Sequence, residues 1–142
     1  MARLAVVSGG GTGIGRATAG MLAGEGYDVL VVGRRADVLT DAVAWIGPQA
    51  AAVTADLADP DQVAAVVRAV AGRPVDVLVN NAGAYVTGDD SSPAAVAAHW
   101  RATFDANVTT AVLLTHALRP LLRRRRLLRR LRSRFRPSLS PR

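Results

Sequence analysis

A glycine-rich segment near the N-terminus constrains the fold of this chain more than any other feature. It runs from Ser8 to Gly15, follows the apolar residues 4–7, and precedes a helix-like stretch and a second apolar run at 28–32. That order is typical of a β-α-β unit. A turn without Cβ atoms lets the backbone approach a phosphate, and the N-terminus of the next helix attracts anions. The segment therefore predicts a site for the phosphates of a nucleotide, and a glycine-rich surface turn is the alternative.

Apolar runs and helical stretches alternate along most of the chain. The sequence predicts strands near 3–7, 28–32, 50–55 and 75–80 and helices near 14–24, 37–46, 60–71 and 94–121. Strands that are apolar throughout are expected in a parallel sheet that helices cover on both faces. Right-handed crossovers then favour a three-layer, doubly wound Rossmann-type α/β fold of about four strands in the order 3-2-1-4. A ligand would bind where strands 1 and 4 diverge.

The charge of the chain changes abruptly near residue 119. All 18 basic residues are Arg, and the chain contains no Lys and no Cys. Residues 1–118 carry seven Arg and eleven acids, a net charge of −4, whereas residues 119–142 carry eleven Arg and no acid, a net charge of +11. We therefore divide the chain into a Rossmann domain at 1–118 and an Arg-rich tail at 119–142, which we expect to be disordered or a basic helix.

Two interpretations of this tail remain open. In a helix, Leu121, Leu128, Leu131 and Phe135 would share one side and Arg would fill the others, as in a helix that binds nucleic acid or an anionic membrane. Alternatively, the tail is the product of a changed reading frame, because Arg, Leu, Ser and Pro all have GC-rich codons. The second interpretation explains at once the change of charge and the absence of acids.

Composition excludes several kinds of site. Without Cys there is no disulfide and no thiolate metal ligand, and His99 and His116 alone cannot form a zinc site, so no metal is expected. The N-terminus lacks a signal-type apolar stretch, and no apolar run approaches the ~20 residues that span a bilayer. We therefore expect a cytoplasmic protein.

Four motifs resemble those of the short-chain dehydrogenase/reductase family. Residues 8–15 are similar to the family's Thr-Gly-x-x-x-Gly-Ile-Gly turn, with Ser8 in place of Thr, and the family's Asn-Asn-Ala-Gly occurs unchanged at 80–83. Asp56-Leu57, after the third predicted strand, and Asn107, in the last predicted helix, match two further family positions. The resemblance extends from residue 1 to about residue 122.

The resemblance implies a nicotinamide dinucleotide site, with Asp56 near the adenine. From the residues alone, Asp56 could equally cap a helix together with Asp59, and Asn81 could tie adjacent loops, hold a ribose or stabilise a turn. The predicted cofactor contacts are Ser8, Gly9, Gly11, Thr12, Gly13, Ile14, Gly15, Arg34, Arg35, Asp56, Leu57, Asn81, Ala82 and Gly83.

The end of the second predicted strand indicates which dinucleotide is preferred. An acid there would bond the 2′-hydroxyl of NAD and repel the 2′-phosphate of NADP. This chain has Arg34 and Arg35 instead, and a guanidinium fork matches a phosphate. We therefore expect a preference for NADP(H) over NAD(H), the alternative being a solvated pair of surface Arg residues.

The chemistry of the family requires residues that this sequence does not supply. The resemblance implies hydride transfer between the cofactor and an alcohol or carbonyl carbon, assisted by a Ser and by Tyr-x-x-x-Lys beyond Leu122. The chain has Tyr only at positions 27 and 85, and no Lys. Asn107 remains from the family's catalytic group, and its alternative is a polar residue packed beside the cleft.

We therefore expect the cofactor-binding half of an oxidoreductase, inactive by itself, whose alcohol or carbonyl substrate requires the other half. An open sheet edge and a bare helix face should promote self-association. The alternative is a non-catalytic nucleotide-binding module whose Arg-rich arm binds nucleic acid or an anionic membrane.

Overall fold

A computed structural model describes residues 2–88 and 90–123 of the 142-residue chain. Strands and helices alternate in it as β1 (Arg3–Ser8), α1 (Gly13–Gly24), β2 (Tyr27–Gly33), α2 (Ala36–Ile46), β3 (Ala50–Thr54), α3 (Pro60–Val70), β4 (Val75–Asn80), α4 (Pro93–Phe104), the π-helical turn η1 (Asp105–Thr109) and α5 (Thr110–Leu118). The four predicted strands and the first three predicted helices are confirmed, with ends that differ by one residue or less.

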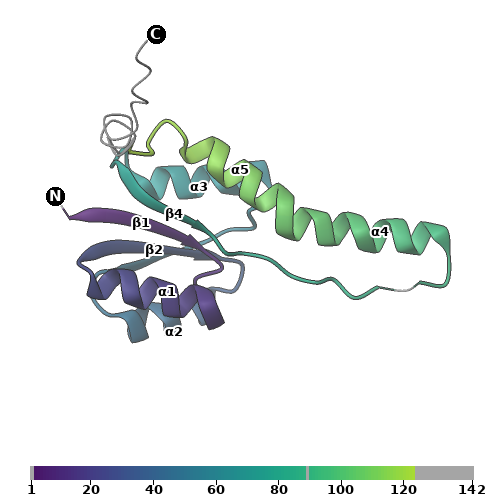
Figure 1. The fold of residues 1–142 in the computed structure, drawn as a ribbon, viewed down its shortest axis with the longest axis horizontal. Coiled ribbons are helices and arrows are strands. Elements are labelled where there is room, and N and C mark those ends of the chain that lie inside the picture. The colour runs from purple at the N-terminus through teal and green to yellow at the C-terminus, as the bar shows by residue number, and fades with distance from the viewer. Residues whose placement is uncertain (1, 89, 124–142) are drawn as a thin grey trace, which may run out of the picture.

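The four strands form one parallel sheet in the order β3-β2-β1-β4, which confirms the predicted topology. In Figure 1, α1 and α2 lie on one side of this sheet and α3 and α5 on the other. Side chains of β1 alternate between the two layers: Leu4 and Val6 pack toward α3 and α5, and Ala5 and Val7 pack toward α1 and α2. The two central strands, β1 and β2, are therefore buried on both faces, as the sequence indicated, whereas the edge strands β3 and β4 are only partly buried.

The last predicted helix, 94–121, is confirmed as one helical stretch, which contains a π-helical turn and ends three residues earlier than predicted. It consists of α4, η1 and α5, and it ends at Leu118. Ser92 caps its start, because the Ser92 hydroxyl accepts a hydrogen bond from the Ala95 N–H at 3.1 Å. At the start of α5 the Thr110 hydroxyl donates to the Ala106 carbonyl of η1 at 3.0 Å. Such side-chain bonds compete with the regular helical ladder, and apolar spacing in the sequence does not reveal them.

After α5 the chain turns back to the start of β4. The Val75 N–H donates to the Leu121 carbonyl at 2.8 Å, and the Arg123 N–H donates to the Val75 carbonyl at 2.9 Å. Leu121 and Leu122 pack on the core beside α5. The predicted basic helix is therefore wrong for residues 121–123, and its remainder lies outside the described residues.

One edge of the sheet stays open in the part of the chain that the structure describes. β4 pairs with β1 on one side, and on its other side the described chain contributes only the bridge between Val75 and Leu122. This agrees with the open edge expected from the sequence. The division at 118/119 into a domain and a tail stays a prediction, since most of the tail is not described.

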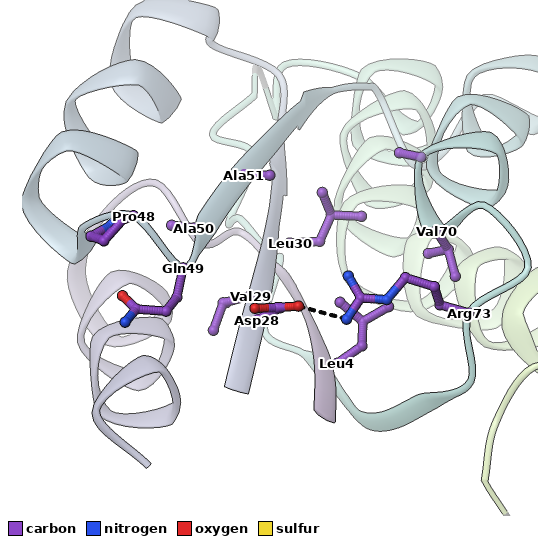
Figure 2. A pocket seen from close by; sticks show the side chains of 11 residues that line it. Leu4, Asp28, Val29, Leu30, Pro48, Gln49, Ala50, Ala51, Val70 and Arg73 are labelled. Atoms are coloured by element: carbon purple, nitrogen blue, oxygen red, sulfur yellow. Dashed lines mark hydrogen bonds and ion pairs between the residues drawn. The ribbon is translucent and has the colours of Figure 1, made fainter. Parts of the chain in front are cut away.

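An ion pair lies at the end of the sheet where the parallel strands begin, which is the end away from the glycine segment. Figure 2 shows Arg73, from the turn after α3, reaching Asp28 at the start of β2, with 2.6 Å between the guanidinium nitrogen and the carboxylate oxygen. The pair borders a hollow of about 240 Å³ that is also lined by Leu4 and Gln49. This hollow lies at the strand starts, so it is separate from the glycine segment at the strand ends.

No helix among the described residues is long and apolar enough to cross a membrane.

Candidate functional site

The glycine segment joins the end of β1 to the start of α1. Gly9 and Gly13 have positive φ angles of 65° and 51°, which a residue with a Cβ rarely adopts. A Cβ built on Gly13 meets nothing within 4 Å, so open space lies in front of this part of the backbone. Thr12, the N-cap residue of α1, makes no side-chain bond to the first turn. The first N–H groups of α1 therefore face an open site suited to an anion.

Close packing at Gly15 fixes the shape of the segment. A Cβ built on Gly15 would overlap the carbonyl group of Gly9 and lie 2.5 Å from the Asn81 side-chain nitrogen. Gly11 is buried against α2, where an added Cβ would lie 2.9 Å from a methyl carbon of Val38. These two glycines hold the segment against its neighbours, whereas the space at Gly13 is open.

Buried hydrogen bonds tie the end of β1 to the end of β4. The Ser8 hydroxyl, in a residue only 2% exposed, accepts from the N–H groups of Asn81 and Ala82 at 3.0 Å each and donates to the Val79 carbonyl at 3.3 Å. The Asn81 side-chain amide donates to the carbonyls of Ser8 and Gly9 at 3.2 Å each. Asn81 thus ties adjacent loops, one of the roles that its sequence allowed, and its contact with a ribose stays a prediction.

The other predicted contacts at this edge differ in exposure. Thr12 and Ile14 are exposed, and the Ile14 side chain is 79% accessible beside the open space. Leu57 is buried in the core, so its side chain is not accessible to a ligand. Asp56 accepts the Ala58 N–H at 3.0 Å, and its own N–H donates to the Gln62 side chain at 2.8 Å. An adenine contact for Asp56 stays a prediction.

The N-cap residue of α3 is Asp59 rather than Asp56. Its carboxylate accepts the side-chain amide of Gln62 at 2.8 Å and the N–H of Asp61 at 2.9 Å. These bonds favour the charged form and lower the pKa of Asp59 below its usual value, the Gln62 bond having the larger effect. Asp56 is left with a carboxylate oxygen that no described side chain engages.

Arg34 and Arg35 follow directly after β2, and Arg35 is the N-cap residue of α2. Both side chains are exposed, and neither forms an ion pair with any described residue. The Gly9 N–H donates to the Val32 carbonyl at 2.7 Å, so the end of β2 adjoins the glycine segment. Two unpaired guanidinium groups therefore stand beside the predicted phosphate site.

Asn107 lies in η1, against the loop that follows Asn81. Its side-chain nitrogen donates to the carbonyls of Ala84 at 2.5 Å and Thr103 at 2.8 Å, and a Cβ built on Gly83 would lie 2.5 Å from its oxygen. The structure thus brings Asn107 beside the predicted cofactor loop. Apolar spacing does not reveal the π-helical turn that contains Asn107, and such turns often occur at functional sites.

The geometry agrees with a known family. The sequence model for short chain dehydrogenase matches residues 3–127. This chain belongs to the short chain dehydrogenase family. It is 33% identical over 119 residues to the serine 3-dehydrogenase of Agrobacterium fabrum, covering 82% of this chain and 47% of that protein. It is 37% identical over 127 residues to the 3-oxoacyl-[acyl-carrier-protein] reductase of Synechocystis, covering 85% and 51%. The chain spans about half the length of the curated relatives it matches.

Two solved structures with the same fold hold nicotinamide dinucleotides. The 3-ketoacyl-(acyl-carrier-protein) reductase of Brucella melitensis, complexed with NADH, is 30% identical with a TM-score of 0.74, and the match covers 84% of this chain and 50% of that one. A metagenomic short-chain oxidoreductase in complex with NADP is 34% identical with a TM-score of 0.72, covering 84% and 56%. This chain therefore has the NAD(P)-binding fold of short-chain dehydrogenase/reductase oxidoreductases.

Proposed function

We propose that this chain binds NADP(H) at the glycine segment and forms the cofactor-binding half of a short-chain dehydrogenase/reductase. The observation that carries the proposal is the open space at Gly13, next to uncapped N–H groups of α1 and the exposed Arg34 and Arg35. Backbone N–H groups would bind the pyrophosphate, and Asn81 would keep the glycine segment in position. When bound, a nicotinamide dinucleotide supplies hydride chemistry toward an alcohol or a carbonyl carbon.

The two Arg residues support NADP(H) over NAD(H). Each guanidinium is exposed and free to pair with a 2′-phosphate, and no carboxylate occupies the end of β2. Calorimetric titration of Arg34→Asp should show NADPH binding weakened at least tenfold and NADH binding nearly unchanged. Arg68→Asp, the same charge change on the exposed end of α3, should leave both affinities unchanged. Equal losses for both cofactors in Arg34→Asp would contradict the preference.

We expect no carbonyl reduction by this chain alone. Tyr27 lies at the strand starts, where its hydroxyl accepts a hydrogen bond from Arg3 at 3.0 Å, and the sequence contains no Lys to lower the pKa of a Tyr. Asn107 is engaged with Ala84 and Thr103 rather than with a proton donor. Steady oxidation of NADPH with small ketones, at a rate above that of buffer, would overturn this expectation.

A bare helix face supports self-association with a second copy of this chain. Trp100, Phe104 and Val108, spaced four residues apart, are 61%, 58% and 41% exposed and line a hollow of about 650 Å³ together with Arg101 and Asp105. In an antiparallel pair of these helices related by a two-fold axis near Phe104, each Arg101 faces the other copy's Asp105. The apolar stripe and the two charges beside it on one copy thus match the same residues on a second copy.

Sedimentation equilibrium tests this pairing. Arg101→Asp places like charges opposite each other and should weaken dimerisation at least tenfold, and the double variant Arg101→Asp with Asp105→Arg should restore it. Met21→Gln, at an apolar side chain that is 63% exposed on α1, should leave it unchanged. A wild-type monomer at all concentrations, or a double variant as weak as the single one, would contradict the pairing.

The Arg-rich tail supports a second candidate function, a nucleotide-binding module that also binds a polyanion. The net charge of +11 over residues 119–142 carries this alternative. A chain shortened to end at Arg123 keeps Leu121 and Leu122 on the core. Under this alternative, the shortened chain should lose binding to duplex DNA and keep nucleotide binding. If the shortened chain still bound duplex DNA, polyanion binding by the Arg-rich tail would be excluded.

A further inference from the structure

Three side chains on one face of the α4–η1 helix contact the same stretch of the loop after β4. His99, Thr103 and Asn107 are spaced four residues apart, so they lie near one another along the helix. Asn107 donates to the Ala84 carbonyl, and the Thr103 hydroxyl accepts the Val86 N–H at 3.4 Å. His99 completes the series farther from the sheet.

His99 holds the loop by packing. The ring of Tyr85 meets the imidazole edge-on, with 5.5 Å between centroids, and a Cβ built on Gly88 would lie 2.6 Å from the His99 Cβ. The Trp100 ring lies nearly parallel to the imidazole, with 6.1 Å between centroids. The His99 side chain is only 7% exposed. The loop backbone therefore rests directly on this ring.

Neither ring nitrogen of His99 has a hydrogen-bond partner among the described residues. The nearest carboxylate oxygen, on Asp90, lies 3.6 Å from Nδ1, which is too far for a hydrogen bond, and the Asp90 side chain is 75% exposed. The imidazole therefore contacts the loop by packing and not by hydrogen bonds. An apolar ring of similar size should serve the same purpose.

The loop that these side chains hold is continuous with the predicted cofactor loop. Gly83 abuts the Asn107 oxygen, Asn81 bonds the glycine segment, and residues 84–88 follow directly. We propose that His99, Thr103 and Asn107 form a ladder of positioning residues that holds residues 84–88 as one wall of the dinucleotide cleft. The assignment of His99 and Thr103 follows from these contacts, and the effect on cofactor affinity rests on the proposed function.

Hydrogen exchange of the unliganded chain tests the ladder without any cofactor. His99→Ala should speed exchange of the Val86 amide, whose N–H donates to Thr103, at least tenfold, whereas His99→Phe should restore the slow exchange. His116→Ala, at the exposed histidine on α5, should leave exchange in this loop unchanged. Equal exchange in His99→Ala and the wild type, or a failure of His99→Phe to restore protection, would overturn the ladder.

Variants of Thr103, together with measurements of NADPH affinity, distinguish a positioning role from an effect on overall stability. Thr103→Val removes the acceptor of the Val86 N–H at constant shape, so exchange at Val86 should rise several-fold while the melting temperature stays within a few degrees. Thr103→Ser should reverse the effect. NADPH affinity should fall in His99→Ala and recover in His99→Phe. Altered hydrogen exchange with unchanged NADPH affinity would support the ladder and contradict its part in the cofactor site. If neither the wild type nor any variant bound NADPH, only the proposed function would be contradicted.

Discussion

Two regions of this molecule reverse the usual distribution of polar and apolar groups, in opposite directions. Where β1 and β4 end, the polar Ser8 is 2% exposed and makes three hydrogen bonds, whereas on α4 the large apolar side chain of Trp100 is 61% exposed. A buried polar group that is fully bonded fixes a backbone shape, and an exposed apolar stripe marks a surface that another element covers. The first region therefore fixes the backbone of the glycine segment, and the second is the surface on which the proposed self-association would depend.

The largest expected effect lies at the strand ends. Gly15→Ala places a methyl group against the Gly9 carbonyl and the Asn81 side chain, so it should lower the free energy of unfolding by about 1–3 kcal/mol or more. Gly24→Ala, at the other end of the same helix, meets nothing within 4 Å and should raise stability by about 0.5–1 kcal/mol. Urea unfolding of both variants compares them directly. A Gly15→Ala protein as stable as Gly24→Ala would show that the close packing is absent in solution.

Ser8→Ala should be the next most costly change. It leaves the N–H groups of Asn81 and Ala82 without their acceptor in a buried site, which should cost about 1–3 kcal/mol. Ser8→Thr retains the hydroxyl and should stay close to the wild type. Thermal unfolding followed by circular dichroism measures both. If Ser8→Ala and Ser8→Thr had the same melting temperature, the hydrogen bonds between the ends of β1 and β4 would contribute nothing to stability.

The bare helix face should tolerate polar substitution. Val112 on α5 is 58% exposed, so Val112→Gln should change the free energy of unfolding by no more than about 0.5 kcal/mol, measured at a concentration at which the chain is monomeric. Leu114, two residues away, is fully buried, and Leu114→Ala should cost about 2–5 kcal/mol. Similar losses in the two variants would mean that this face is covered within the monomer.

The smallest expected effect concerns Asp59, an exposed carboxylate at the same end of the sheet as Ser8. Hydrogen bonds in the folded state lower its pKa, so its contribution to stability is present above about pH 3.8, the ordinary pKa of an Asp, and declines as the pH falls through the folded value. Asp59→Asn keeps a cap on α3 and should flatten the stability profile below pH 4 by a small amount. Urea midpoints at pH 3 and pH 6 measure the difference. An unchanged profile would exclude a contribution from Asp59.

Local patterns predicted the fold and part of the site. Continuous apolar runs and glycine-marked turns lie within a few residues of one another, so they indicated the four strands and placed Gly9 to Gly15 on a strand-to-helix turn. The bonds of Ser8 could not be predicted, because they join it to Asn81, 73 residues later. The hydrogen bond of Asn107 reaches Ala84, 23 residues earlier, and the pairing of Leu122 with Val75 depends on a strand edge that only the assembled sheet creates.

Calorimetric titration with NADPH tests whether the open space at Gly13 receives a dinucleotide phosphate. Gly13→Asp introduces a carboxylate into that space at a positive φ that Asp tolerates, and Gly26→Asp makes the same change at a φ of 80° with open space at the opposite end of the sheet. The wild type and Gly26→Asp should bind NADPH with similar affinity, and Gly13→Asp should bind at least tenfold more weakly. Equal affinity in all three proteins, or no binding by the wild type, would contradict phosphate binding in that space.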